Sequence, residues 1–308
     1  MILIDDRGTQ DPYLHIAIED YIVRNIDTTD TDYVLLYIND PCVVVGKNQS
    51  IYKEVNFNYL RNAENAVVRR ISGGGTVYHD TGNLCFSFLS KFEDTKVNNY
   101  RYFNQPIVEA LQAVGIDATF SPRNDILWKD KKISGNAQFT DRKNILSHGT
   151  LLVNTDTEKL RGALAPNAFE VQSKAVSSVR SAVMNISQGS ERFQTAAQLR
   201  EYLFSALPIT ATYTFTQQQW QEIIASAQTK YSSTAWIYGR NPATHIVKPE
   251  LILEIENGLI TSIEVLDANY EWLQTIVGVG YNYTAVLAAM AMAQIDRDKL
   301  AAMAQIVF

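Results

Sequence analysis

The chain of 308 residues has few of the residue types on which several protein classes depend. Its two cysteines, Cys42 and Cys85, cannot build the disulfide framework of a small secreted domain. Each lies among apolar neighbours, as small buried cysteines usually do. The four histidines are far apart, and neither a CxxC nor an HExxH spacing occurs. The common zinc sites that such motifs encode are therefore excluded.

Long hydrophobic runs and clusters of positive charge are also missing. The longest apolar run, 285–293, is much shorter than the roughly 20 residues of a membrane-spanning helix. Asp5 and Asp6 stand where a signal peptide would carry positive charge. The 27 basic and 33 acidic residues give a net charge of −6, the wrong sign for a duplex-binding surface. We therefore expect a cytoplasmic protein that binds neither membranes nor nucleic acid.

Hydrophobic residues make up 46% of the chain, enough for a large core, so disorder of the whole chain is excluded. Helical periodicity predicts an amphipathic helix over 12–25, with Glu19 and Asp20 away from its apolar face, and a second helix over 102–114 that ends at Gly115. Short apolar, β-branched runs predict strands at 33–38, 42–45, 66–70, 84–89 and 149–153, and a hairpin at 126–134. Strands and helices without regular βαβ alternation favour an α+β fold with a mixed or antiparallel sheet and packed helices.

The segment WIYGRNP at 236–242 interrupts regular structure. After it, Asn257-Gly258 between two apolar runs predicts a hairpin, and an Ala/Met-rich helix follows from about Ala285. The length also suggests two domains. We predict a large domain over 1–243 and a small α+β domain over 244–308.

The most informative segment runs from Arg69 to Asp80 and reads RRISGGGTVYHD. Three consecutive glycines indicate a close approach of the backbone to something, and their N–H groups can form a concave anion site. Arg70 adds a cation suited to phosphate or carboxylate. The alternative is a tight turn between strands with solvated arginines. The segment matches neither GxxxxGK[ST] nor GxGxxG, so a nucleotide would bind there in another geometry.

Residues 123–137 carry the second chemical signal. With a two-residue turn near Asp130, alternation puts Asp125, Leu127, Lys132, Ser134 and Asn136 on one face of the hairpin and leaves Lys131 at the turn. The alternative is an exposed hairpin with solvated lysines, but the small residues after Lys132 leave room for a ligand.

Two histidines are weaker site candidates. His148, followed by Gly149, could face a ligand or be bonded inside a core with about equal probability. His79, beside the glycine-rich turn, is the better candidate. The polar basic loop at 174–181 has no unique chemical interpretation by itself.

In combination these segments resemble the lipoate–protein ligases of the biotinyl/lipoyl ligase superfamily. The motifs are RRISGGGTVYHDTGN, RNDI, KKISGNAQ and HGTLLVN in this order, with further likeness at 11–24, 41–47, 54–56 and 178–181. The likeness covers most of 1–185, and the region after 236 resembles the family's small accessory domain. It implies a catalytic domain related to class II aminoacyl-tRNA synthetases, followed by a mobile domain.

The resemblance implies a two-step, AMP-forming reaction. Lipoate and ATP, usually with Mg²⁺, would give lipoyl-adenylate and pyrophosphate. A lysine of an apo-lipoyl domain would then take the acyl group, in 2-oxoacid dehydrogenase complexes or in the glycine-cleavage H protein.

The resemblance also assigns roles to residues. Lys132 would be the central catalytic cation, and Arg70 would bind the carboxylate or adenylate end. Asp125 would orient Lys132 or contact Mg²⁺. The implied substrate- and nucleotide-binding set is Ser72, Gly73, Gly74, Gly75, Thr76, Val77, Tyr78, His79, Asn83, Asp125, His148 and Gly149. Departures from the family pattern at Lys47, Ser50 and Ala182 affect the expected phosphate or acceptor contacts.

Two alternatives remain open. An octanoyl or lipoyl transferase of the same superfamily would need an exposed, activated cysteine, whereas Cys42 and Cys85 lie in strand-like apolar runs. A non-catalytic paralogue would bind lipoate, nucleotide or acceptor without reaction, and the joint presence of Lys132, Arg70 and Asp125 argues against it. A biotin ligase is disfavoured because its GRGRxGRxW-type loop is absent.

Overall fold

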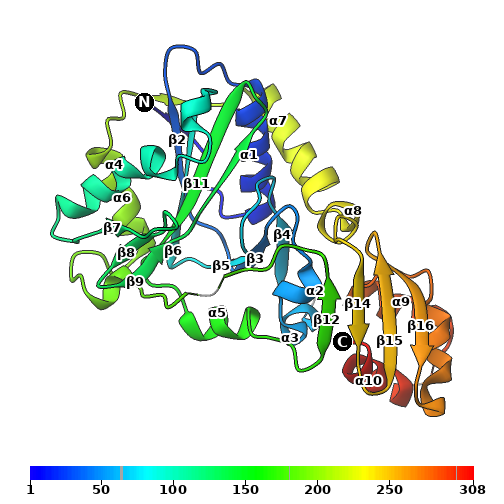
Figure 1. The fold of residues 1–308 in the computed structure, drawn as a ribbon. Coiled ribbons are helices and arrows are strands. Elements are labelled where there is room, and N and C mark those ends of the chain that lie inside the picture. Colours follow the sequence, from blue (N-terminus) through cyan, green and yellow to red (C-terminus); the bar gives the residue numbers. More distant parts are fainter. Residues whose placement is uncertain (63–64, 180, 296) are drawn as a thin grey trace.

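The structure is a computed structural model that describes residues 1–62, 65–179, 181–295 and 297–308 (Figure 1). Its centre is a six-stranded sheet in the order β10-β11-β6-β2-β1-β13. These strands are β10 (Asn136–Thr140), β11 (Asn144–Leu152), β6 (Asn83–Lys91), β2 (Tyr33–Tyr37), β1 (Ile2–Ile4) and β13 (Ala211–Tyr213). The first four pair antiparallel, whereas β1 is parallel to both β2 and β13. The sheet is therefore mixed, as predicted.

Helices cover both faces of this sheet: α1 and α7 lie on one face, α4 and α6 on the other (Figure 1). The helices are α1 (Pro12–Asn25), α2 (Ile51–Glu54), α3 (Phe57–Arg61), α4 (Tyr100–Gln112), α5 (Thr157–Ala163), α6 (Ala196–Ala206), α7 (Gln217–Ser226), α8 (Thr234–Ile237), α9 (Tyr283–Met292) and α10 (Arg297–Ile306). Further helical turns are η1 (Asp94–Lys96), η2 (Ile186–Gln188), η3 (Ala227–Tyr231) and η4 (Ala268–Ile276).

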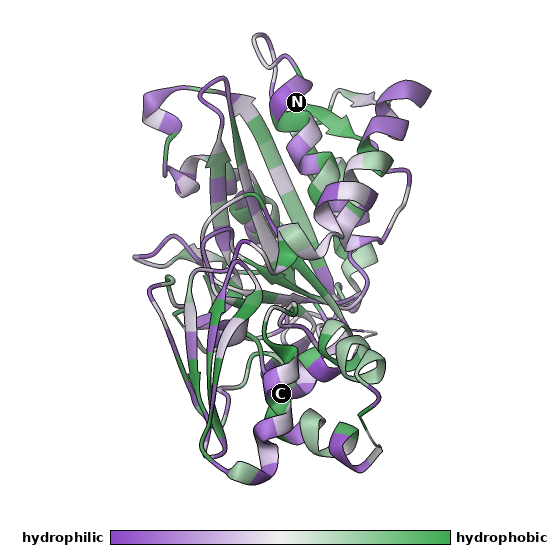
Figure 2. Ribbon diagram, turned by 90° about the vertical axis from the view of Figure 1, so that its right-hand side faces the viewer, coloured by the Kyte–Doolittle hydropathy of each residue, from purple (hydrophilic) through white to green (hydrophobic). Residues whose placement is uncertain are grey.

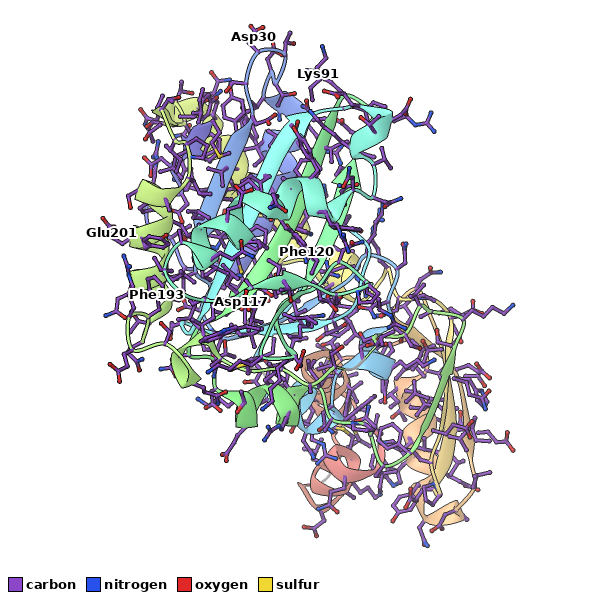
Figure 3. All side chains as sticks on the ribbon, turned by 60° about the vertical axis from the view of Figure 1, so that its left-hand side comes forward. Asp30, Lys91, Asp117, Phe120, Phe193 and Glu201 are labelled. Carbon is purple, nitrogen blue, oxygen red and sulfur yellow. The ribbon has the colours of Figure 1, made fainter. Side chains whose placement is uncertain are left out.

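The alternation of side chains along β2 explains why this strand is apolar throughout. Val34 and Leu36 pack with α4 and α6, whereas Leu35 and Tyr37 pack with α1. A strand covered on both faces needs an unbroken apolar run. Figure 2 shows hydrophobic colour along the central strands and hydrophilic colour on outer loops. In Figure 3, Glu201 marks the exposed side of α6.

The helix predicted over 12–25 is α1, and the side chain of Asp11 caps its first turn. The assignment of Glu19 and Asp20 to its polar side is wrong, because both are buried. The sheet covers one side of α1, and α7 with η3 covers another, so more than one stripe of the helix is buried.

Two three-stranded sheets flank the large one. One has the order β4-β3-β5, from Ala66–Arg69 (β4), Cys42–Val45 (β3) and Val77–His79 (β5). β3 is parallel to β4 and antiparallel to β5, so the glycine-rich segment connects two strands on either side of β3. The other is an antiparallel sheet of β7 (Thr119–Phe120), β8 (Ile126–Trp128) and β9 (Lys131–Ser134).

The hairpin predicted over 126–134 is formed by β8 and β9. Its turn is Lys129-Asp130, whose φ angles of 50° and 59° fit a two-residue hairpin turn. Lys131 was predicted to lie in the turn, and this is wrong: it belongs to β9 and pairs with Trp128.

A bulge changes the predicted faces of this hairpin. Leu127 pairs with Lys132, but the register shifts so that Ile126 pairs with Ser134. Ser134 is therefore fully buried, and its placement on the polar face is wrong. The extra residue that a bulge inserts reverses the alternation on one strand.

An antiparallel sheet in the order β12-β14-β15-β16 forms the C-terminal region. Its strands are Glu170–Ser173 (β12), Thr244–Val247 (β14), Leu251–Glu256 (β15) and Leu259–Val265 (β16). Asn257 and Gly258 make the predicted hairpin turn with positive φ. β14 begins at Thr244, where we predict the second domain to begin, yet β12 comes from the preceding region.

The single closing helix predicted from about Ala285 is instead two helices, α9 and α10, because α9 ends at Met292 and Gln294 has a φ of 56°. Both pack on the C-terminal sheet in a core that also includes Val43 of β3 and Tyr52 of α2. Within the described residues, no helix is both long and apolar enough to cross a membrane.

Candidate active site

A cavity of about 390 Å³ lies where the glycine-rich segment, the β8–β9 hairpin, β11 and the 174–181 loop meet. The predicted site residues that line it are Arg70, Gly74, Gly75, Thr76, Val77, His79, Asp125, Lys132, His148 and Gly149. The predicted residues Ser72, Gly73, Tyr78 and Asn83 lie outside its lining. The fold thus brings segments that are far apart in the sequence to one hollow.

A larger hollow of about 590 Å³ lies beside α4, between Phe88 and Ser90 of β6 and Arg101 and Tyr102. It contains none of the predicted site residues, so we place the candidate active site in the smaller cavity.

Lys132 and Asp125 form an ion pair at the cavity wall. Lys132 Nζ lies 2.9 Å from Asp125 Oδ1, and the two side chains are 23% and 19% exposed. The pair is therefore accessible to a ligand while being held in place. The prediction that these two side chains share a face is confirmed by the structure.

The surroundings of Lys132 fix its backbone and leave room for its side chain. Its N–H donates to Ala182 O, and its carbonyl accepts from Met184 N, so an isolated parallel bridge to Val183 holds the 182–184 segment beside β9. A Cβ on Gly135 would lie 3.1 Å from Lys132 Cε and Nζ. A larger residue at 135 would crowd the ammonium.

Arg70 is buried, and its guanidinium holds the glycine-rich segment together. Nη2 donates to Gly73 O at 2.6 Å and to Gly75 O at 2.7 Å, Nη1 donates to Val44 O, and Nε donates to Ser72 Oγ. Burial lowers the pKa of Arg70 to about 10, against the opposing charge of Glu19. The alternative of solvated arginines is wrong.

Close packing explains Gly74 and Gly46, whereas a Cβ on Gly73 would meet nothing within 4 Å. Gly74 has a φ of 87°, and a Cβ there would lie 2.9 Å from Arg70 Nη2. A Cβ on Gly46 would lie 2.2 Å from Gly74 O. Among the described residues, nothing accepts a hydrogen bond from the backbone N–H groups of Gly73, Gly74 and Gly75. Of these three residues, Gly74 and Gly75 line the cavity.

The 174–181 loop closes the cavity through Ser178. Ser178 Oγ accepts from Thr76 N and from Gln49 Nε2, and Gln49 Oε1 accepts from Thr76 Oγ1. Arg180 lies outside the described residues. A loop with no unique chemical interpretation in the sequence thus forms part of the cavity wall.

Arg69, the neighbour of Arg70, is fully buried away from the cavity. It donates to the carbonyls of Gly46, Lys47, Gln49 and Ile237 and to Asn241 Oδ1. Trp236 Nε1 donates to its carbonyl. Arg69 therefore connects the 236–242 segment to residues 46–49, which follow β3.

His79 lines the cavity as a neutral ring. Its Nδ1 accepts from Asn39 Nδ2 at 2.9 Å. Burial and the charge of Arg70 lower its pKa to about 3. Asn83, in contrast, donates to Cys85 Sγ and is not part of the cavity lining.

His148 combines the two interpretations left open by the sequence, because it lines the cavity and is bonded within the core. Its Nδ1 lies 2.9 Å from Glu19 Oε1, and its Nε2 lies 2.6 Å from Ser72 Oγ. Packing explains why residue 149 is a glycine, since a Cβ there would lie 2.5 Å from Phe86 Cζ.

Sequence reasoning missed Glu19, Gln49 and Asn136. Asn136 lines the cavity and lies in the hairpin segment, so its position could have been assigned from the motif. Glu19 is recognisable only from the packing of α1 on the central sheet, where it meets His148. Gln49 is recognisable only from the 174–181 loop, which lies more than 100 residues away in sequence.

Neither cysteine is an activated thiol. Burial raises the pKa of both thiols, Cys42 and Cys85, although Cys85 lines the cavity. A cysteine nucleophile needs a lowered pKa. The site therefore does not fit a transferase that carries its acyl group on cysteine.

The donor set is poor in metal ligands. Among the described residues, no group of three or more His, Cys, Asp or Glu side chains is placed to hold a metal ion. Within the part of the chain that the structure describes, Asp125 is the one carboxylate that lines the cavity. This fits Mg²⁺ held mainly by phosphate oxygens, as is usual in nucleotide sites.

A family model described as the lipoyl protein ligase A/B catalytic domain matches residues 11–208. Lipoate-protein ligase LplJ of Bacillus subtilis is 35% identical over 279 residues, which cover 86% of this chain and 84% of that protein. Lipoate–protein ligase 1 of Staphylococcus aureus is 38% identical over 267 residues, which cover 84% of this chain and 79% of that protein.

Among solved structures, a Thermoplasma acidophilum protein with bound lipoic acid has a TM-score of 0.64 at 25% identity, covering 77% of this chain and 97% of that chain. The structural likeness confirms the predicted α+β fold, and the sequence likeness extends over most of the chain. The chain therefore belongs to the lipoate–protein ligase family.

Proposed function

We propose that this lipoate–protein ligase uses ATP to convert lipoate to lipoyl-AMP and then transfers the lipoyl group to a lysine of a lipoyl domain. The acceptors are lipoyl domains of 2-oxoacid dehydrogenase complexes and the glycine-cleavage H protein. One observation carries the proposal: a partly exposed Lys132–Asp125 pair lines the same cavity as a glycine-rich segment with free N–H groups.

In the first step, a carboxylate oxygen of lipoate bonds to the α-phosphorus of ATP. The bond between the α-phosphorus and the oxygen that bridges it to the β-phosphorus breaks, and pyrophosphate leaves. Two anions must meet, so fixed positive charge has to face the developing charge. Lys132 supplies it, because its ammonium is accessible and has one carboxylate partner. Asp125 keeps the ammonium in place until a ligand oxygen enters.

The glycine-rich segment supplies backbone donors. Arg70 holds the carbonyls of Gly73 and Gly75 inward, which supports a segment whose N–H groups turn toward the ligand. Such preorganised donors need no reorganisation when charge develops.

The cavity also suits the apolar end of lipoate. Ile16, Val44, Val77 and Ala137 line it, and its volume lies within the range of small-molecule sites. The lipoic acid in the structure from Thermoplasma acidophilum supports lipoate as the substrate.

In the second step, the neutral amine of the acceptor lysine attacks the acyl carbon, AMP leaves, and the amine loses a proton. The chain needs no nucleophile of its own, which agrees with the raised pKa of both cysteines. Mg²⁺ would neutralise phosphate charge, with Asp125 as the side chain that would hold it.

Residues 1–243 form the catalytic domain of this proposal, and residues 244–308 form the accessory domain. The start of β14 at Thr244 supports the division. The cytoplasmic location predicted from the sequence stays a prediction.

Mass spectrometry of an apo-lipoyl domain incubated with this protein, lipoate and ATP tests the proposal. We expect the mass of one lipoyl group on one lysine, and none when lipoate, ATP or the protein is omitted. Modification without ATP from an acylated carrier would favour a transferase. Tight lipoate binding without AMP release would favour a non-catalytic paralogue.

A further inference from the structure

Glu19 is a buried carboxylate that the proposed reaction does not use. It lies on α1, is fully buried, and is not part of the cavity wall. It faces His148 Nδ1 and accepts from Ser87 Oγ and Tyr37 Oη. Burial raises the pKa of Glu19, but the contact with His148 and these hydrogen bonds outweigh it and hold the pKa below its ordinary value. Glu19 is therefore ionised.

A hydrogen-bonded chain leads from Glu19 to the glycine-rich segment. His148 Nε2 lies 2.6 Å from Ser72 Oγ, and Ser72 Oγ accepts from Arg70 Nε at 3.0 Å. None of the residues in this hydrogen-bonded series, from Glu19 through His148 and Ser72 to Arg70, is more than 8% exposed. Water therefore does not compete for these hydrogen bonds, and the orientation of one group affects the orientation of the next.

The carboxylate at one end orients the histidine. Because an ionised carboxylate can only accept, His148 Nδ1 carries a hydrogen. His148 Nε2 on the other side of the ring is bonded to Ser72 Oγ. Ser72 Oγ in turn accepts from Arg70 Nε. A histidine tautomer fixed by a carboxylate behind it is a common way to orient a group in front.

We infer that Glu19 is a positioning residue for lipoate activation, acting on Arg70 through His148 and Ser72. This rests on the proposed function, in which Arg70 shapes the segment that meets the reacting oxygens. Without an acceptor at 19, the His148 ring loses the partner that holds it against Ser72. Arg70 then loses one of the bonds that set the plane of its guanidinium.

The test uses two variants that break the chain at different points. Glu19→Met removes the acceptor at similar side-chain volume, and Ser72→Ala cuts the link between His148 and Arg70. Lipoate-dependent exchange of pyrophosphate into ATP measures the activation step. We expect kcat to fall in both, up to roughly 100-fold as for other losses of geometry, with KM for ATP within about twofold.

Two comparisons separate positioning from a merely structural role. Glu19→Gln retains an acceptor oxygen and should recover most of the kcat lost in Glu19→Met. Ser87→Ala removes one bond to Glu19 outside the chain, so it should lower the melting temperature while leaving kcat near that of the wild type.

The double variant Glu19→Met/Ser72→Ala tests whether the residues act in series. Residues that act through one path are not additive, so we expect a kcat no lower than that of the worse single variant. Multiplied losses, or a wild-type kcat in Ser72→Ala, would overturn the inference even if Glu19→Met did not fold. Absence of exchange in the wild-type protein would instead overturn the proposed function.

Discussion

Arg70 and Lys132 both line the cavity, but the chain holds them in opposite ways. Arg70 is buried and donates to Val44, Ser72, Gly73 and Gly75 of the protein itself. Lys132 is partly exposed and has a single carboxylate partner. A cation whose donors are occupied shapes the site, whereas a cation with one exchangeable partner can move its contact to a substrate oxygen.

This contrast predicts the largest effect at Lys132. Lys132→Ala should reduce adenylate formation by about 10²–10³ or more, the cost of losing an oriented donor, while the fold stays intact. Lipoate-dependent pyrophosphate exchange measures adenylate formation, and circular dichroism checks the fold.

Lys131→Ala is the matched control, because Lys131 is an exposed neighbour on the same strand. It should retain full exchange activity. Near-normal turnover in Lys132→Ala would remove Lys132 from its role.

Arg69 is buried beside Arg70 but does not line the cavity. Arg69→Met should lower the free energy of unfolding by roughly 3 kcal/mol, since it leaves several buried carbonyls without a donor. Chemical denaturation measures this.

Arg240→Met is the control for Arg69. Arg240 is exposed and lies over the Trp236 ring at 4.4 Å, so its loss should cost no more than about 1 kcal/mol. Equal costs for the two arginines would contradict a fastening role for Arg69.

A smaller effect is expected where Arg70 meets the glycines. Gly74→Ala should lower the free energy of unfolding by about 1–3 kcal/mol, because residue 74 has a φ of 87° and its Cβ would press on Arg70 Nη2. Gly73→Ala should cost less, since a Cβ there meets nothing within 4 Å. A reversed order in thermal denaturation would show that Arg70 does not organise this segment.

Local alternation was enough to place Asp125 and Lys132 on one face, because both lie on a short hairpin. It failed for Ser134, where a bulge shifts the register by one residue. It also failed for Glu19, which lies against Tyr37, Ser87 and His148 of the central sheet, up to 129 residues later in the sequence. The strand β12 likewise pairs with β14 across some 70 residues. Features decided by distant packing leave little trace in local periodicity.

A third cation, Lys248, extends the comparison to the C-terminal region. It is buried after β14, with Nζ 4.1 Å from the centre of the Phe169 ring and 5.4 Å from that of Phe57. Burial, with a smaller contribution from Arg61, lowers its pKa to about 7, against the opposing charge of Glu250. Unlike Lys132, it lies among aromatic rings without a salt bridge in the described part of the chain.

The lowered pKa of Lys248 predicts that stability depends on pH. Between about pH 7 and pH 10, the unfolded chain carries a proton on this lysine that the folded chain lacks, so unfolding takes up a proton and stability rises with pH. The gain is about 1 kcal/mol per pH unit near pH 8. Denaturation curves at pH 7, 8 and 9 should show this rise in the wild type and in Lys131→Met, an exposed control, but not in Lys248→Met. If the free energy of unfolding changed with pH in the same way in all three proteins, Lys248 would keep its charge in the folded state. Its aromatic neighbours would then stabilise the ammonium as a carboxylate does for Lys132.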